Sequence, residues 1–149
     1  MILDSKLSSV LHVLLHMAHS DKPMTSQEMA ARLNSNAVVV RRVMAGLRVA
    51  GYITSEKGHG GGWSMACRLD DVTLHDIYKA VGASKLFAIG NRSENPACLV
   101  EQAVNEALSS ALKDAEALVL DRLAHITLAD LSADFNRRFA RFQPEIPHS

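Results

Sequence analysis

Hydrophobic positions recur with a helical period along most of the chain, and polar positions fill the faces between them. Within residues 3–19 the apolar side chains are three or four residues apart, which predicts an amphipathic first helix. Those side chains are Leu7, Leu11, Leu14, Leu15 and Ala18. Further helices are predicted over residues 26–33, 36–50, 74–81 and 128–142. The chain is therefore expected to be mainly α-helical.

Capping residues mark the ends of the second and third predicted helices. The sequence TSQE predicts a capping box. In it the Thr25 side chain accepts a hydrogen bond from an unpaired backbone amide of the first turn, and the Glu28 side chain reaches back to the backbone amide of Thr25. The second helix is expected to end at Asn34 in a left-handed turn, with Ser35 capping the third helix and Gly51 closing it. Two short helices joined by a tight polar turn are typical of a helix-turn-helix, although any helical hairpin shares this pattern.

The third predicted helix has an unusual outward face. Its inward stripe consists of Val40, Val43, Met44 and Leu47, which leaves outside Asn36, Val38, Val39, Arg41, Arg42 and Ala45. Exposed valines beside paired arginines suit a helix in the DNA major groove, where arginine reaches guanine or phosphate and methyl groups contact thymine. A solvated arginine pair is the simpler alternative, and the position within a helix-turn-helix favours DNA recognition over it.

A β-hairpin is predicted after the third helix. The segments YITSEK and WSMAC both alternate, and four of the eight glycines of the chain lie between them. A glycine-rich tip with Lys57 and His59 at its edge brings backbone amides close to another backbone, as in a wing that rests on the minor groove. A nucleotide-binding loop is disfavoured because the Walker lysine–serine pair and the dinucleotide spacing are both missing. Trp63 is expected to anchor the hairpin on the helices rather than stack on a base.

The longest periodic run extends from residue 97 to about residue 125. Its apolar side consists of Leu99, Ala103, Ala107, Leu108, Ala111, Leu112, Ala115, Leu118 and Val119. A helix of this length spans about 40 Å, which exceeds what so small a domain covers. We therefore expect it to pair with the same helix of a second copy. Thr73 and Thr127 are expected to cap the helices over residues 74–81 and 128–142.

Composition and charge narrow the class of protein. A chain of 149 residues suits one compact domain with a helical extension, and the short apolar stretch VLHVLLHMA predicts neither a membrane span nor a secretory leader. A cytoplasmic location is expected. Net charge is zero, but residues 32–63 are basic (Arg32, Arg41, Arg42, Arg48 and Lys57 against Glu56), whereas residues 94–134 are mainly acidic. The first segment is therefore the one suited to a polyanion.

These motifs, in this order, resemble the Rrf2 family of winged-helix transcriptional regulators, which includes IscR, NsrR and CymR. The resemblance rests on NSNAVVVRRVMAGLRVAGYITSEKGHGGGW, then VTLHDIYKAVG, NPAC at the start of the long helix, and TLADL after it. It implies a homodimer, formed through the long helix at residues 98–125, that binds double-stranded operator DNA. We expect a repressor, with an activator as the alternative. The implied DNA-binding residues are Ser35, Asn36, Val38, Val39, Arg41, Arg42, Lys57, His59, Gly60 and Gly61.

The same resemblance implies a domain organisation. A winged helix-turn-helix domain is expected at residues 1–82, a connecting loop at 83–97, a helical dimerisation region at 98–142 and a flexible tail at 143–149. The fold class is thus mainly α with a small β-hairpin.

Several members of this family hold an iron–sulfur cluster through three cysteines near the start of the long helix. Here only Cys98 matches, because the other cysteine, Cys67, follows the hairpin. One thiolate does not supply the ligands that a cluster needs, so we expect a cluster-free member without a cofactor. The helix start is expected to lower the pKa of Cys98, which makes it a candidate redox sensor. A small-molecule signal, a cluster completed by a ligand such as His12 of a partner chain, and a purely structural Cys98 stay as alternatives.

Other functions have weaker support. His12, His16 and His19 share one side of the first helix and are candidate metal ligands, with a plain polar face as the alternative. The chain contains no nucleophile elbow, metalloprotease motif or phosphate loop, so an enzyme is not expected. An adaptor that dimerises without touching DNA is the third class, and it would lack the steep salt dependence of DNA binding. Tyr78, Phe87, Phe135 and Phe139 are interpreted as core or interface residues.

Overall fold

A computed structural model describes residues 2–3, 5–58, 61–82, 87–88 and 98–142. It confirms the mainly α-helical fold class with a two-stranded antiparallel hairpin. The helices are α1 Ser5–Ala18, α2 Ser26–Leu33, α3 Ala37–Val49, α4 Leu74–Ala80, α5 Leu99–Leu123 and α6 Leu128–Arg141, with a short 3-10 turn, η1, at Leu69–Asp71. The strands are β1 Ile2–Leu3, β2 Ile53–Glu56, β3 Gly62–Met65 and β4 Phe87–Ala88.

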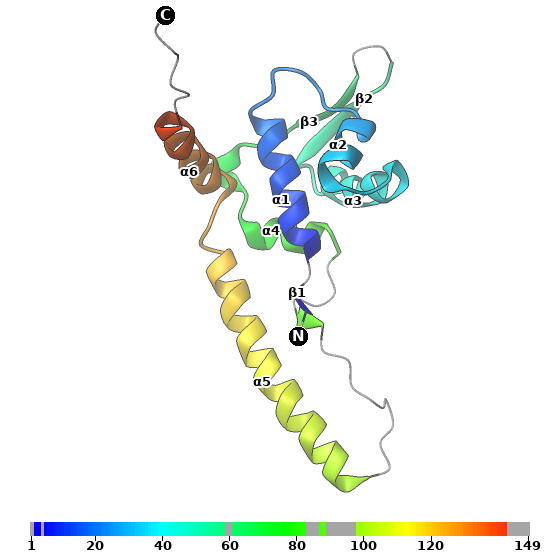
Figure 1. Cartoon of the computed structure of the whole chain (residues 1–149), viewed down its shortest axis with the longest axis vertical. Coiled ribbons are helices and arrows are strands. Elements are labelled where there is room, and N and C mark those ends of the chain that lie inside the picture. Colours follow the sequence, from blue (N-terminus) through cyan, green and yellow to red (C-terminus); the bar gives the residue numbers. More distant parts are fainter. Residues whose placement is uncertain (1, 4, 59–60, 83–86, 89–97, 143–149) are drawn as a thin grey trace, which may run out of the picture.

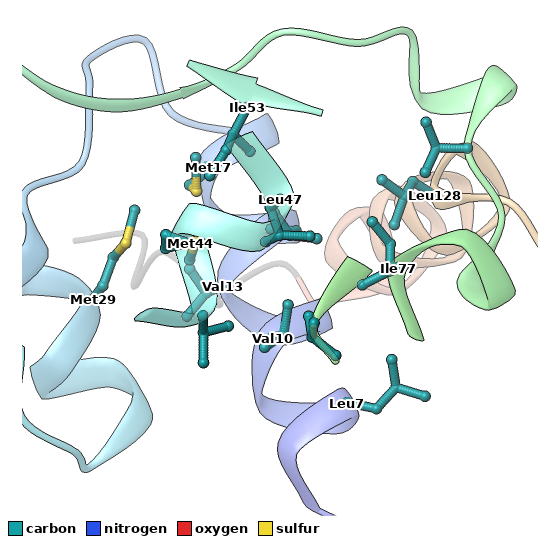
Figure 2. Packing of buried hydrophobic residues seen from close by; sticks show 14 of the residues in the cluster. Leu7, Val10, Val13, Met17, Met29, Met44, Leu47, Ile53, Ile77 and Leu128 are labelled. Carbon is teal, nitrogen blue, oxygen red and sulfur yellow. The ribbon is translucent and has the colours of Figure 1, made fainter. Parts of the chain in front are cut away.

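The hydrophobic core surrounds α1, which lies between the α2–α3 pair on one side and α4 and α6 on the other (Figure 1). Val10 and Val13 of α1 are fully buried and face Met44 and Leu47 of α3 and Ile77 of α4 (Figure 2). The inward stripe predicted for the third helix, Val40, Val43, Met44 and Leu47, is confirmed as buried. Burial of side chains from so many segments fixes α3 against the rest of the domain.

Three capping boxes set the starts of α2, α4 and α6. The Thr25–Glu28 box is confirmed, with Glu28 N donating to Thr25 Oγ1 over 3.1 Å and Thr25 N donating to Glu28 over 3.2 Å. Thr73 and Thr127 cap α4 and α6 as predicted, and each forms a full box with the aspartate three residues later, Asp76 or Asp130. Each of these helices therefore begins where the sequence places it.

The cap of α3 was predicted wrongly. Asn34 adopts the expected left-handed conformation, with φ of 50°. Because of that turn, Ser35 N donates back to Ala30 O over 2.9 Å, which makes Ser35 part of the end of α2. Asn36 caps α3 instead, since its Oδ1 accepts from Val39 N over 3.0 Å. Helix α3 begins at Ala37, one residue later than expected.

The hairpin is attached to the start of α2. Ile53 pairs with Met65 and Glu56 pairs with Gly62 in the β2–β3 register. Backbone hydrogen bonds of 2.8 and 2.9 Å join Trp63 to Met24 in both directions. Trp63 Nε1 also donates to Ser26 Oγ over 3.0 Å. The interpretation of Trp63 as a hairpin anchor is confirmed.

Some elements were not predicted. The pair β1–β4 joins Ile2 to Ala88 and Leu3 to Phe87. Strand β4 lies within the stretch expected to be only loop, and Leu3 was expected to begin the first helix, which starts at Ser5 instead. Strands of two residues are too short to show an alternating pattern, which explains why the sequence does not reveal them. The η1 turn was missed for the same reason. The rest of the expected loop at 83–97 and the tail at 143–149 lie outside the described residues.

The long helix α5 extends away from the domain core (Figure 1). Val119, Leu120 and Leu123, near its C-terminal end, pack against the core, but no side chain of α5 is buried. The segment after α5 is held by hydrogen bonds of 2.9 Å from Leu74 N to Ile126 O and from Leu128 N to Val72 O. Among the helices of the described residues, none combines the length and apolar character needed to cross a membrane.

Candidate nucleic-acid interface

The outward face of α3 combines apolar and basic side chains. Val38 is 63% exposed and Val39 is 43% exposed, and both lie beside the exposed Arg41 and Arg42. A valine at this exposure leaves methyl groups in water, which is unfavourable for a surface without a partner. Asn36 is also exposed, but its side-chain oxygen is engaged in capping, so only its amide group remains to contact a ligand.

A groove of about 530 Å³ separates α3 from the hairpin. It is lined by Ser26, Arg41, Ala45, Arg48, Ser55, Glu56, Lys57, Gly62 and Trp63. Three cationic side chains and one carboxylate thus face a single groove, which gives it a net positive charge. Arg42 is not among the lining residues, so the two predicted arginines have different surroundings.

Sequence reasoning missed Arg48 as a candidate. It lies seven residues after Arg41, which is two turns of the same helix, and both arginines therefore line the groove. That spacing is the signal that could have found it. Ser35, in contrast, belongs to the end of α2, and its backbone amide is already bonded to Ala30.

The glycines of the hairpin have a role within the fold. A Cβ atom on Gly62 would lie 2.6 Å from Met24 O, and one on Gly61 would lie 2.3 Å from Glu56 O. Both contacts are with backbone atoms, so neither position accepts a side chain without distortion. Gly61 and Gly62 therefore allow the hairpin to close and to pair with Met24, in addition to any approach to DNA. His59 and Gly60 lie outside the described residues.

The two cysteines have different environments. Cys98 is exposed at the N-terminus of α5, where the backbone amides of Glu101 and then Val100 lower the pKa of its thiol. Burial raises the pKa of the Cys67 thiol, and the nearby Asp71 carboxylate adds to this effect. Cys98 therefore forms a thiolate more readily than Cys67.

The three histidines expected to share one side of the first helix do not act as one group, and His19 follows the end of α1. His12 Nε2 and His16 Nε2 are 2.9 Å apart, whereas His19 Nε2 lies 3.1 Å from Ser132 Oγ and its ring packs on Phe135. Burial, followed by the charge of Arg32 and the nearby His12 and His19, lowers the pKa of His16. Among the described residues no three metal-binding side chains come together.

Comparison with protein families decides the class of this fold. The family model Rrf2, described as an iron-dependent transcriptional regulator, matches residues 3–134. The chain belongs to the Rrf2 family. The prediction from the helix-turn-helix, the glycine-rich hairpin and the long helix is thereby confirmed.

Individual relatives of this Rrf2 regulator agree with that assignment. YwnA of Bacillus subtilis, named as an HTH-type transcriptional regulator, is 30% identical over 131 residues, which cover 87% of this chain and 96% of YwnA. A crystal structure of a protein named as a transcriptional regulator from Lactobacillus plantarum is 27% identical, with a TM-score of 0.69 and coverage of 89% and 90% of the two chains. CymR of B. subtilis, named as the global cysteine regulator, matches in fold alone, at 23% identity and a TM-score of 0.58 over 89% of this chain and 98% of CymR. The family and these relatives are transcriptional regulators and not enzymes.

Proposed function

We propose that this Rrf2 regulator is a homodimer that binds a partly palindromic operator sequence-specifically and acts as a repressor. The observation that carries the proposal is the positively charged groove between α3 and the hairpin, which is lined by Arg41, Arg48 and Lys57. A DNA duplex carries closely spaced phosphates, so such a groove is suited to follow one strand.

The two sides of the groove would contact different parts of the duplex. Helix α3 would enter the major groove, with Val38 and Val39 against thymine methyl groups and Arg41 and Arg42 reaching base edges or phosphates. Their exposure supports this placement. The hairpin would rest on the minor groove with Lys57 and the neighbouring His59, Gly60 and Gly61 at the contact. Ser35 and Asn36 would approach the backbone where α3 begins.

The long helix supports the dimer. Within residues 98–125, α5 exposes Val104 and Leu108, each 50% exposed, together with the more exposed Leu99, Val100 and Leu118. A helix of 25 residues with no buried side chain needs a partner to cover its apolar side. A second copy of α5 would cover it and would set two α3 helices one helical turn of DNA, or a small multiple, apart.

Cys98 is the candidate for the signal. Its exposure and lowered pKa favour oxidation to a sulfenic acid or a disulfide, which would alter the dimer helix at its first turn. A small-molecule signal is the alternative input. A cluster-sensing function is disfavoured because the whole chain has two cysteines, and only Cys98 lies in the segment where cluster-binding relatives have three.

The first experiment identifies the DNA. Genomic footprinting of the bound protein would give the operator, and duplexes of that operator and of a scrambled sequence would then be used in gel shifts. Arg41→Ala is expected to weaken operator binding by about 1–3 kcal/mol if Arg41 reads a base, and to weaken both duplexes alike if it contacts phosphate.

A matched control removes a distant arginine. Arg137→Ala deletes an arginine that is paired with Asp134 on α6, and it should leave both affinities unchanged. Unchanged affinity of Arg41→Ala for both duplexes would exclude Arg41 from the interface. If the protein bound neither duplex even at low salt, the adaptor alternative would be favoured instead.

A further inference from the structure

Two histidines on the surface of α1 form a close pair that the DNA-binding proposal does not use. His12 and His16 are one helical turn apart, and their Nε2 atoms are separated by 2.9 Å. Their rings are tilted by 43° with centroids 4.7 Å apart. Two imidazole nitrogens at this distance either share a proton in an N–H···N hydrogen bond or bind a common cation.

The distance selects among the geometries of a bound cation. Metal–nitrogen bonds are about 2.0–2.1 Å long, so two nitrogens at a right angle are about 2.9 Å apart, and two at a tetrahedral angle about 3.3 Å apart. The observed 2.9 Å matches adjacent positions of a square-planar or octahedral centre. We propose that His12 and His16 form a two-histidine chelate for a divalent transition-metal ion, with Cu²⁺ bound more tightly than Ni²⁺ and water at the remaining positions.

The surroundings decide how strong such a site would be. Arg32 Nη1 lies 3.4 Å from both ring nitrogens of His16, so its charge opposes a bound cation. Arg32 is exposed at the end of α2, so its side chain has room to turn away from a bound cation. His19 does not join the pair because its ring is held by Ser132 and Phe135. The chelate therefore has two protein ligands and one opposing charge.

Metal binding leaves the number of protons on the two histidine rings unchanged. In the neutral hydrogen-bonded pair one ring carries its proton on Nε2 and the other carries it on Nδ1. When both Nε2 atoms bind the metal, the first ring moves its proton to Nδ1 through solvent. The pair takes up the cation without net release of a proton.

The test uses the full-length protein with both cysteines replaced by serine, so that thiols do not compete for the metal. Calorimetric titration with NiCl₂ measures affinity, and electron paramagnetic resonance of the Cu²⁺-loaded protein counts coordinated nitrogens. His12→Gln and His16→Gln should each lower Ni²⁺ affinity about 10²-fold because the second contact is lost. The double variant retains neither ligand and should show no binding at this site.

Two further variants complete the test. His19→Gln should leave affinity unchanged, and Arg32→Gln should raise it by removal of the opposing charge. Thermal unfolding confirms that each variant remains folded. Unchanged affinity of His12→Gln or His16→Gln, or an equal loss in His19→Gln, would overturn the chelate and leave the hydrogen bond as the role of the pair. Neither result bears on operator binding, which gel shifts measure separately.

Discussion

Gly46 lies in the middle of α3, at a position where alanine would normally stabilise a helix by about 1 kcal/mol. A Cβ atom there would lie 2.3 Å from Ala80 O at the end of α4. Because that atom belongs to the backbone, it moves only if α4 shifts against α3. From the sequence alone Gly46 is only a residue of low helix propensity, because Ala80, the neighbour that leaves no room for a side chain, is 34 residues away. This close approach helps to hold α3 in place.

We expect Gly46→Ala to lower the free energy of unfolding by about 1–3 kcal/mol, as overpacking does, despite the better helix propensity of alanine. Urea unfolding at fixed protein concentration measures this change. Arg48→Ala, two residues along on the exposed side, should change stability by less than about 0.5 kcal/mol. A Gly46→Ala protein more stable than the parent would show that α3 and α4 do not pack this closely.

The contrast between the two cysteines gives a second prediction at the same scale. Amides of the first turn of α5 lower the pKa of Cys98, whereas burial raises that of Cys67, so the Cys98 thiolate exists at lower pH. Alkylation by iodoacetamide should therefore be faster at Cys98 at neutral pH, and its pH–rate curve should lie at lower pH. Cys67→Ser and Cys98→Ser isolate each thiol for mass spectrometry. Coincident pH–rate curves would remove the basis for oxidation of Cys98 as a signal.

At the scale of the elements, most locally determined features could be predicted, apart from the cap of α3, and those fixed by distant contacts could not. Thr25, Thr73 and Thr127 cap their helices as the sequence indicates, because a capping box involves residues only three apart. The cap of α3 was misplaced to Ser35, whose amide is drawn back to α2 by the left-handed Asn34. The groove between α3 and the hairpin depends on the Trp63–Met24 pairing, which joins segments far apart in sequence. Arg41 and Lys57 were thus predicted from the sequence, whereas Arg48 was missed and the groove that the three side chains share could not be predicted.

The capping box of α6 is expected to contribute measurably to stability. Asp130 N donates to Thr127 Oγ1 over 3.1 Å, and Thr127 N donates to Asp130 over 2.9 Å. Thr127→Ala should lower the free energy of unfolding by about 1 kcal/mol, whereas Thr127→Ser keeps the hydroxyl and most of the stability. Urea unfolding measures both. Equal losses in the two variants would point to the threonine methyl group rather than to the cap.

At the scale of the molecule, the exposed apolar side of α5 accounts for the dimer proposal. The apolar side predicted from the sequence included Leu99 and Ala103. A helix turns by about 100° per residue, so the residues that share one side are instead Val100, Val104, Leu108, Ala115 and Leu118. Val119 and Leu123, which pack on the domain core, lie beside this side. The apolar stripe therefore adjoins the core near the C-terminal end of α5 and is exposed along the rest of the helix. The sequence predicted that this helix needs a partner, but not which side faces it.

A double substitution in the uncovered half tests the dimer without disturbing the domain core. Val104→Glu with Leu108→Glu places two carboxylates on the proposed interface, where burial of a charge without a partner is costly. We expect a monomer by analytical ultracentrifugation with unchanged helix content by circular dichroism. Operator affinity should fall steeply, because one α3 helix then contacts one half-site without the gain from a linked second contact.

The control changes charge on the opposite side of the same helix. Lys113 lies nine residues after Val104, about 180° around the helix, and is exposed. Two negative units are added by the double substitution, so Lys113→Glu matches it in charge and should leave both the dimer and operator binding unchanged. Dimers that persist in the double variant at micromolar concentration would exclude this stripe as the interface. If the double variant and Lys113→Glu were both monomeric, the dissociation would be explained by repulsion between negatively charged helices and not by the cost of burying charge on the apolar side.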